Sequence, residues 1–284
     1  MRNLISAGLN RLWRSKAFWL SCVFLAGETL TALRTRYNDR IELGVVNYID
    51  GCFFSYVAFI GILIAMVCAL LLGTDYSDGA IRNKVTVGCE RRNIYLANLA
   101  VCSVAALAMC ASAIFPGLCV GIPLLGSFHM DASRAVLFIL GTLALALAYA
   151  AIFTLLSMLV TNRSVSAVAA LLTALTLLAV GVYADSRLQA GPTIDGLVIT
   201  TTDESGNIDW ENSTTEKQPN PLYLPDGPLR NAYDFVHDFT PGGQVMQYAS
   251  MSPKRPEIMI FYNAVIVIAT TALGLFIFRR KDLK

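Results

Sequence analysis

Six long apolar runs, separated by polar segments, dominate the pattern of hydrophobic positions along the chain. They cover residues 17–33, 52–73, 94–125, 134–160, 165–183 and 258–278. About 20 consecutive apolar residues are enough for a helix to cross the hydrocarbon core of a bilayer. The pattern therefore predicts an all-α polytopic membrane protein with six transmembrane helices.

The third apolar run differs from the others because it contains residues that disturb helices. These residues are Pro116, Gly117, Gly121 and Pro123. Proline lacks the backbone N–H donor and clashes with the preceding helical turn. We therefore expect a kink or a re-entrant bend in this run.

Residues 1–16 have the pattern of an amphipathic helix. A helical period places one set of apolar residues on a single face: Leu4, Ile5, Leu9, Leu12 and Trp13. We expect this helix to lie along the inner membrane surface, with basic side chains toward lipid phosphates. A simple N-terminal extension of the first span stays open as the alternative. The segment lacks the layout of a cleavable signal peptide, so we expect it to be retained.

A polar stretch, residues 184–257, separates the fifth and sixth spans and predicts a small α+β extracytoplasmic insertion. Extended runs at 196–202 and 207–211 flank a Gly206-Asn207 turn, which favours a β-hairpin. A helix is expected from Pro228 onward, and a second one after residues 240–243. The other divisions are spans one to five at 17–183, with a cytoplasmic loop at 74–93, and span six with a basic tail at 258–284.

Charged residues are few, and their positions predict the orientation of the spans. The chain is 55% hydrophobic and 15% charged. If both termini are inside, thirteen of the 22 Lys and Arg residues fall in the inner segments, as the positive-inside rule requires. Arg34, Arg36 and Arg40 in the first outer loop run against the rule. We expect a multi-pass protein of the cell membrane with cytoplasmic termini, and a net charge of +2 gives no reason to expect a nucleic-acid partner.

Little in the sequence points to catalysis, a cofactor or a metal ion. The seven cysteines lack the close paired spacing of zinc and redox sites. The two histidines, His129 and His237, fall in outer loops and are expected to be surface residues. No metalloprotease, serine hydrolase or phosphate-loop motif is present in the sequence. If the protein uses ATP, a partner chain must bind it.

Glu28 is the single acidic residue inside a predicted span. An unpaired charge in the bilayer interior is costly, so Glu28 is a candidate intramembrane polar site. It could be a proton or ion site, but it could also lie near the outer interface or pair with a polar group on another helix. A secondary transporter or an intramembrane enzyme would show more polar groups within its spans, so Glu28 alone does not support either class.

A short charged insert, residues 74–93, separates the second and third apolar runs. It begins with residues suited to a helix start and ends with one suited to a helix stop: Asp75, Ser77, Asp78 and Gly88. Ile81 and Val85 are four residues apart and share one face of the predicted helix. A solvated loop that fixes topology needs only basic residues. An apolar pair pointing away from the membrane favours instead a knob that docks into another protein's groove.

The insert carries the run D-Y-S-D-G-A-I-R-N-K at 75–84, then Gly88, Arg91 and I-Y-L-A-N-L at 94–99. This pattern resembles the first cytoplasmic loop of ABC transporter permeases of the type-two exporter family. The sequence departs from the family pattern at four positions, Ala80, Cys89, Glu90 and Ala97. The surface helix, the six spans, the stretch at 241–244 and the basic end are weaker similarities. The resemblance does not cover residues 185–238.

The resemblance implies a permease subunit that is not itself an enzyme, forms a homodimer or heterodimer, and binds a separate ABC ATPase. Residues 77–88 would be the coupling helix. The implied ATPase-coupling residues are Asp75, Asp78, Gly79, Ile81, Arg82, Lys84, Val85 and Arg91. Ile81 and Val85 would make apolar contacts, so replacing both by Asp should leave the spans folded and abolish ATPase association.

The implied activity is export of an unidentified substrate, such as a peptide, a drug or a lipid-like molecule. The alternative is a membrane sensor, immunity or scaffold protein of the same fold, which binds an external peptide without transport. A third class, the secondary transporter or intramembrane enzyme, has only Glu28 in its favour.

Overall fold

The computed structural model describes the backbone of residues 1–44, 48–202 and 208–280. Within these ranges the chain is mostly helical, with one two-stranded sheet. The helices are α1 (Arg2–Trp13), α2 (Lys16–Glu42), α3 (Asp50–Phe53), α4 (Val57–Ser77), α5 (Ala80–Thr86), α6 (Arg91–Leu125), α7 (Ala132–Leu159), α8 (Arg163–Gln189), α9 (Pro228–Phe239), α10 (Pro241–Ala249) and α11 (Pro256–Arg280). The strands are β1 (Thr193–Thr202) and β2 (Ile208–Pro219).

Six helical segments of the described chain are long and apolar enough to cross a membrane. They are α2, α3 together with α4, α6, α7, α8 and α11. The chain is a multi-pass membrane protein. The predicted fold class is confirmed, including the small sheet between the fifth and sixth spans.

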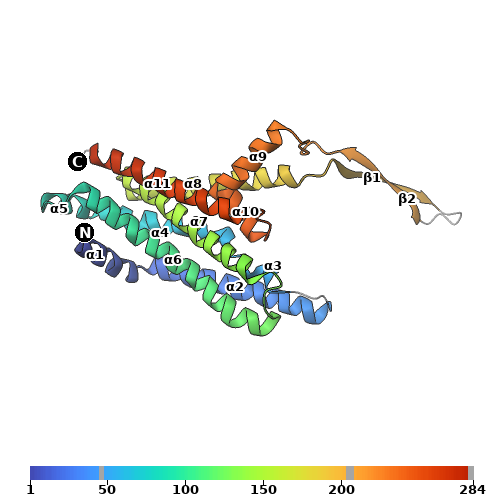
Figure 1. Ribbon diagram of the computed structural model, residues 1–284, viewed down its shortest axis with the longest axis horizontal. Coiled ribbons are helices and arrows are strands. Elements are labelled where there is room, and N and C mark those ends of the chain that lie inside the picture. Colours follow the sequence, from blue (N-terminus) through green and yellow to red (C-terminus); the bar gives the residue numbers. More distant parts are fainter. Residues whose placement is uncertain (45–47, 203–207, 281–284) are drawn as a thin grey trace.

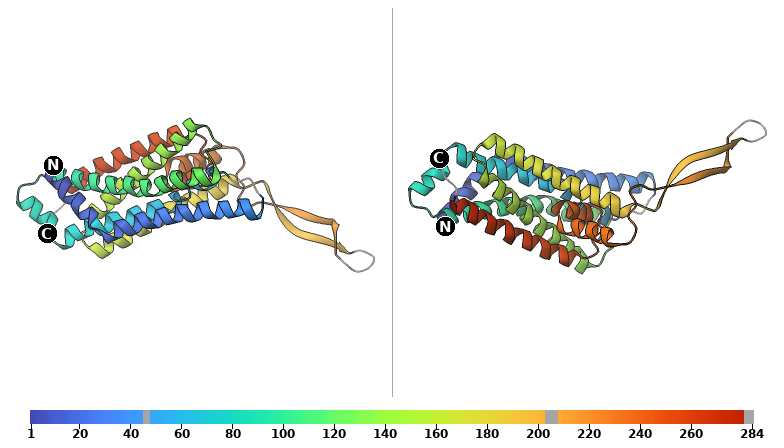
Figure 2. Two further views of the ribbon diagram at one scale, coloured as in Figure 1. Left: turned by 90° about the horizontal axis from the view of Figure 1, so that it is seen from below. Right: turned by 90° about the horizontal axis from the view of Figure 1, so that it is seen from above.

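The two ends of the helical bundle carry different features (Figures 1 and 2). The N-terminus, the end of α11 and α5 lie at one end, which we call the terminal end. The β1–β2 hairpin projects from the opposite end, which we call the hairpin end. An even number of spans places the two termini on the same side, so this arrangement agrees with the six-span reading.

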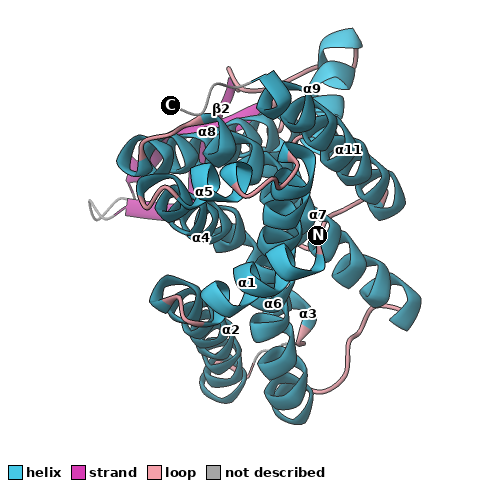
Figure 3. Cartoon of the chain, turned by 90° about the vertical axis from the view of Figure 1, so that its left-hand side faces the viewer, coloured by secondary structure: helices cyan, strands magenta, loops and turns pink. Residues whose placement is uncertain are grey.

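Helix α4 contacts α6, α7 and α8, while α2 packs mainly on α6 and α11 on α7 (Figure 3). The approach of α4 to α7 depends on Gly61, where an added Cβ would lie 2.8 Å from the ring of Tyr149. Near the hairpin end, the Tyr56 hydroxyl donates a hydrogen bond of 3.1 Å to Thr142 Oγ1 of α7. Such interhelical contacts hold a bundle together where lipid gives no hydrophobic drive between helices.

Three helix starts follow from their capping residues. Ser15 Oγ accepts a hydrogen bond of 3.4 Å from the N–H of Phe18 at the start of α2. Asn162 caps α8 in the same way, and Thr240 caps α10 ahead of Pro241. A side-chain oxygen at this position satisfies an N–H group that the helix itself leaves unpaired. The Ser15 cap also separates α1 from α2, so the N-terminal segment is a helix of its own.

The structure differs from two expectations about the spans. Helix α2 continues to Glu42, although the first span was predicted to end at residue 33. The length of an apolar run indicates only the part of a helix that lies in the hydrocarbon core. Beyond that part the helix can continue into water through polar residues such as Arg36 and Arg40. The third run is one continuous helix, α6, through both Pro116 and Pro123, so the re-entrant bend was wrong, and the alternative of a kink stays a prediction. Proline is tolerated in membrane helices where the freed carbonyls find other partners.

The predicted hairpin is present and is longer than expected. Strands β1 and β2 pair antiparallel, from Thr193 opposite Pro219 to Thr202 opposite Ile208, with two register shifts between. The predicted Gly206-Asn207 turn lies outside the described residues. Helix α9 begins at Pro228 as predicted, and α10 follows it almost immediately.

Replacing Gly242 by Ala is expected to displace α10 from α8. A Cβ at Gly242 would overlap the backbone carbonyl oxygen of Leu177, which cannot move aside like a flexible side chain. Overpacking of this kind costs about 1–3 kcal/mol. A titration with denaturing detergent should show this loss of unfolding free energy. Gly27→Ala is the control, because a Cβ there meets nothing within 4 Å; an equal loss in both variants would contradict the close approach.

Candidate functional site

The charged insert forms α5, a helix of 7 residues between the ends of α4 and α6 at the terminal end (Figure 1). Gly79 enters it with φ +67°, and Gly88 leaves it with φ +91°. The N–H of Cys89 donates to the carbonyl of Lys84, and the N–H of Gly88 donates to that of Val85, each at 3.0 Å. These two bonds form a Schellman motif. The prediction that Gly88 ends the helix is confirmed.

Asp75 occupies a position that the sequence did not reveal. It lies inside the last turn of α4 and is only 1% exposed. Its carboxylate forms an ion pair with Arg11 of α1, and a second one with the Lys84 ammonium of α5 at 3.2 Å. We call these three residues the Asp75 cluster. The cluster joins α1 to α4 and α5, although Arg11 lies far from Asp75 and Lys84 in the sequence.

The expectation that Asp75 and Asp78 begin the short helix was wrong. Helix α4 runs on to Ser77, and Asp78 is the residue that ends it. Helix α5 begins one residue after Gly79 and has no side-chain cap. Helix α4 continues beyond its apolar part because the ion pairs of the buried Asp75 hold its last turn in place.

Two cations share the single carboxylate of the Asp75 cluster. Burial, followed by the nearby Arg11 guanidinium, lowers the pKa of the Lys84 ammonium. Burial also lowers the pKa of the Arg11 guanidinium. Both cations therefore depend on Asp75, since removing charge from water is costly unless it is paired.

The apolar pair on α5 faces the opposite way from the prediction. Ile81 is 1% exposed and belongs to the hydrophobic core, and Val85 is half-buried against that core. The pair therefore anchors α5 to the bundle, and it is not a knob pointing outward. Replacing both residues by Asp would disturb this packing, so the double substitution is no clean test of docking.

The exposed surface of the insert consists of other residues. Arg82, Asn83 and Thr86 are exposed on α5, and Val87 just after it is 84% exposed. We call these four residues the α5 surface. Single exposed apolar side chains are common on protein surfaces, so Val87 is a candidate contact only together with the polar residues beside it. In the sequence, Val87 is an apolar residue directly before Gly88, the residue that ends the helix. The spacing of four between Ile81 and Val85 favoured that pair as the contact residues instead.

Arg91 lies at the first position of α6. Its guanidinium donates a hydrogen bond of 3.2 Å to the carbonyl oxygen of Arg279 in the last turn of α11. A cation at a helix C-terminus is favourable because the carbonyls there carry partial negative charge. Arg91 thus connects the ends of two spans beside α5, and its predicted contact with an ATPase stays a prediction.

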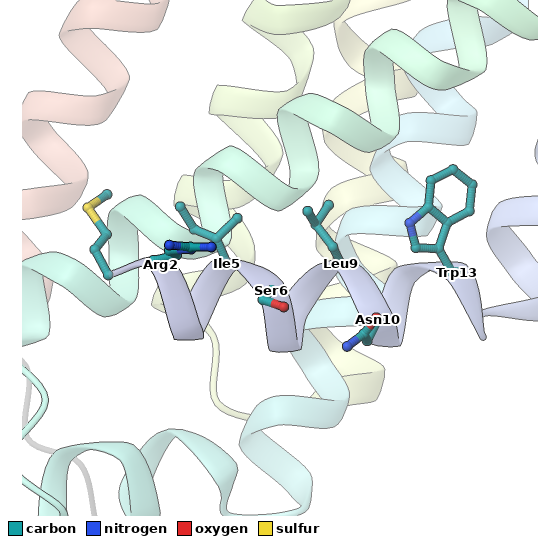
Figure 4. Close-up of a pocket in the computed structure, with 7 residues that line it drawn as sticks. Arg2, Ile5, Ser6, Leu9, Asn10 and Trp13 are labelled. Atoms are coloured by element: carbon teal, nitrogen blue, oxygen red, sulfur yellow. The ribbon is translucent and has the colours of Figure 1, made fainter.

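Helix α1 presents two different sides. On one side, Gly8 lies so close to α6 that an added Cβ would be 2.6 Å from Val101 Cγ2. On another side a surface hollow of about 660 Å³ is lined by residues of α1, with Ile5, Leu9 and Trp13 in a row along the helix (Figure 4). Trp13 is exposed and also packs against Phe18 and Trp19. The helix therefore combines a packed side with an apolar stripe that the described chain covers only in part.

Glu28 has a structural partner. It is half-buried on α2, and its carboxylate accepts a hydrogen bond of 3.2 Å from the Ser55 hydroxyl in the α3–α4 connection. This is the interhelical pairing that the sequence left open as one reading. Among the described residues, no group of three or more His, Cys, Asp or Glu side chains could hold a metal ion.

The two histidines differ in their surroundings. His129 is exposed, as predicted, and its ring lies 4.8 Å from that of Tyr48. His237 on α9 is only 8% exposed, so its assignment to the surface was wrong. Its Nε2 lies 3.3 Å from a carboxylate oxygen of Asp185 near the end of α8. The return of the chain from α9 into the buried helix α10 explains this burial.

Acidification is expected to loosen α9. Burial lowers the pKa of His237 below its usual 6.5, although Asp185, Asp238 and Asp234 act to raise it. The packed state therefore binds fewer protons than an opened state, and it loses stability as the pH falls below about 6.5. Hydrogen exchange of the α9 amides, corrected for intrinsic rates, should be faster at pH 5.5 than at pH 7.5. His237→Asn should abolish the difference and His129→Asn should keep it; a difference that survives His237→Asn contradicts this assignment.

No protein-family model matches the chain, and no curated protein sequence is similar enough to count as a relative.

Proposed function

We propose that the chain is the membrane-spanning permease subunit of an ATP-driven ABC exporter. ATP hydrolysis would take place on a separate ATPase subunit bound at the α5 surface. The observation that supports this proposal most is the construction of α5, a short helix closed by glycines at both ends and fixed to the bundle by Ile81 and Lys84. Its fixed side leaves Arg82 and Val87 free to meet a partner.

The contacts beneath α5 suit the transmission of movement. The Asp75 cluster connects α5 to α4 and α1. One residue further on, the Tyr76 hydroxyl donates a hydrogen bond of 2.6 Å to the carbonyl oxygen of Met158 in α7. A displacement of α5 by an ATPase would therefore act on three helices of the permease at once, because packed and hydrogen-bonded elements shift as units.

The proposed orientation puts the terminal end in the cytoplasm. The α5 surface, α1 and the last turn of α11 all carry basic residues there, as the positive-inside rule requires. The partly exposed stripe of α1 with Ile5, Leu9 and Trp13 would rest in the interface of the inner leaflet (Figure 4). The hairpin would then project outside the cell.

A second permease copy, identical or related, is the further proposed partner. Helices α8 and α11 are the least buried of the candidate spans, with 22% and 17% of their apolar windows buried. Lipid or a second permease must cover these faces. In an ABC exporter two permease subunits enclose the transport path, and the substrate here is unidentified.

The test is to purify the full chain from the membranes of its own host under mild conditions. We expect a polypeptide with an ATP-binding phosphate loop to co-purify, and the complex to hydrolyse ATP. The chain expressed alone should not hydrolyse ATP. Absence of any ATP-binding polypeptide from a complex that keeps its folded bundle would overturn the proposal.

The projecting hairpin favours a second candidate, a membrane sensor, immunity or scaffold protein of the same fold. Within the described residues, strands β1 and β2 pair only with each other, and they extend away from the bundle, as a peptide-binding arm would (Figures 1 and 2). Reconstitution with the ATPase distinguishes the two functions. ATP-dependent movement of a labelled substrate across the vesicle membrane supports export, and ligand binding without movement supports the sensor.

A further inference from the structure

A polar cavity of about 400 Å³ opens at the hairpin end, between α8, α9, α10 and the segment that leads into α11. Its wall contains three carboxylates, three permanent cations and the buried His237: Asp185, Asp234, Asp238, Arg230, Lys254 and Arg255. Pockets for small ligands have volumes of about 300–1,000 Å³. The cavity is therefore large enough for a compact ligand, and its permanent charges balance.

The charges are not evenly distributed through the cavity. The carboxylates of Asp185 and Asp238 are deep, with side chains 15% and 20% exposed. The Arg255 side chain is 63% exposed, and Lys254 is exposed too. The inner part of the cavity is thus acidic and its rim is basic.

Arg230 is the one cation placed deeper in the wall, and it is already engaged. Its guanidinium donates hydrogen bonds to the carbonyl oxygens of Leu188 at 3.1 Å and Leu224 at 2.7 Å. The same guanidinium forms an ion pair with Asp226 at 3.7 Å and none with Asp185. Asp185 already accepts hydrogen bonds from Gln189 Nε2 at 2.7 and 2.8 Å. Because a carboxylate has about four acceptor sites, a cation that enters the cavity would still find acceptors there.

Three groups of the wall retain hydrogen-bonding capacity within the described part of the chain. His237 Nε2 is buried and makes no hydrogen bond there, although an Asp185 carboxylate oxygen lies 3.3 Å away. Asp234 and Lys254 form no ion pair there, although both lie close enough to influence His237. A buried polar atom without a partner is costly, so a bound donor near His237 and Asp185 would be favourable.

We propose that this cavity binds a small zwitterion, with its primary ammonium group between Asp185, Asp234 and His237 and its anionic group at Lys254 on the rim. An ammonium supplies three N–H donors, which matches two carboxylates and one imidazole nitrogen. Net-neutral walls favour a ligand that carries both charges over one that carries a single charge. The proposal stands apart from ATPase coupling, which concerns the opposite end of the bundle.

Two sources offer this chemistry at the outer end of a membrane protein. A dipeptide carries an ammonium and a carboxylate, and the phosphatidylethanolamine headgroup carries an ammonium and a phosphate. Both fit the acidic interior and the basic rim, so the experiment needs one arm for each source.

In the first arm, the full chain in phosphatidylglycerol nanodiscs is titrated calorimetrically with Ala-Ala, N-acetyl-Ala-Ala and Ala-Ala amide at pH 7.5. If the source is a dipeptide, Ala-Ala binds, the acetylated peptide binds at least about tenfold more weakly, and the amide is weakened less. In the second arm, native mass spectrometry compares retention of phosphatidylethanolamine and phosphatidylglycerol. Selective retention of phosphatidylethanolamine identifies the headgroup as the source.

The variant Asp185→Asn with Asp234→Asn removes the acidic interior and should weaken whichever ligand binds by at least about tenfold. Asp131→Asn with Asp195→Asn is the control, because both side chains are exposed and neither residue lines the cavity. Hydrogen exchange of α9 establishes that each variant keeps its packing. The proposal is overturned if neither ligand binds, if acetylation has no effect on peptide binding and the lipids are retained equally, or if the control variant loses as much affinity as the cavity variant.

Discussion

The double variant Arg82→Glu, Val87→Asp is expected to lose at least about 30-fold in affinity for the ATPase while its bundle stays folded. Both side chains are exposed on the α5 surface, and neither belongs to the hydrophobic core. The change replaces a cation and an apolar contact by two carboxylates, which reverses the charge that a partner would meet. Quantitative co-purification of the ATPase with the tagged permease measures the loss.

A matched control makes the same chemical change at the opposite end of the bundle, where α2 ends. Arg40→Glu with Leu43→Asp also replaces an exposed Arg and an exposed apolar residue by carboxylates, but at the hairpin end. We expect this variant to retain the ATPase fully. Equal loss in both variants would mean that surface charge in general, and not the α5 surface, controls association.

Asp75→Ala is expected to destabilise the folded bundle by about 3 kcal/mol. The substitution leaves Arg11 and Lys84 without their common carboxylate, and both cations are partly buried. Breaking a buried ion pair costs about 3–5 kcal/mol. The lower value applies here because the side chains of Arg11 and Lys84 are 35% and 26% exposed to water. Unfolding by titration with denaturing detergent gives the free energy.

The neighbouring acid provides the control for this measurement. Asp78 is exposed and forms no ion pair in the described chain, so Asp78→Ala should change the unfolding free energy by less than about 0.5 kcal/mol. In a background that carries Arg11→Met and Lys84→Met, Asp75→Ala should cost much less than in the native chain. A cost that stays the same in that background would show that the three residues are not coupled.

The number and approximate position of the spans could be read from the sequence because apolar length is a local property. A run such as 134–160 must be buried in lipid or protein wherever it lies, and α7 coincides with it closely. The end of α2 could not be read in this way. The helix continues through polar residues as far as Glu42, so the hydrophobic pattern does not predict where a helix ends once it has left the membrane.

The sequence predicted the position of the short helix α5 correctly, but it predicted the wrong face of α5 as the exposed one. Glycine at 79 and 88 marks the limits of α5 because both positions have positive φ. The face of α5 that is buried depends on where α4 and α1 lie, which no local period reveals. The pairing of Asp75 with Arg11 joins residues from separate helices, and so does that of His237 with Asp185. Such long-range contacts cannot be read from a local sequence pattern.

The most direct test of the central claim is photo-crosslinking from the α5 surface in the native membrane. A benzoyl-phenylalanine in place of Val87 should form an adduct with a polypeptide that binds ATP. The same probe in place of Phe115, which is exposed on α6 within the third span, should form no such adduct. Absence of the adduct at position 87, or an equal yield at position 115, would contradict the proposal that α5 docks an ATPase.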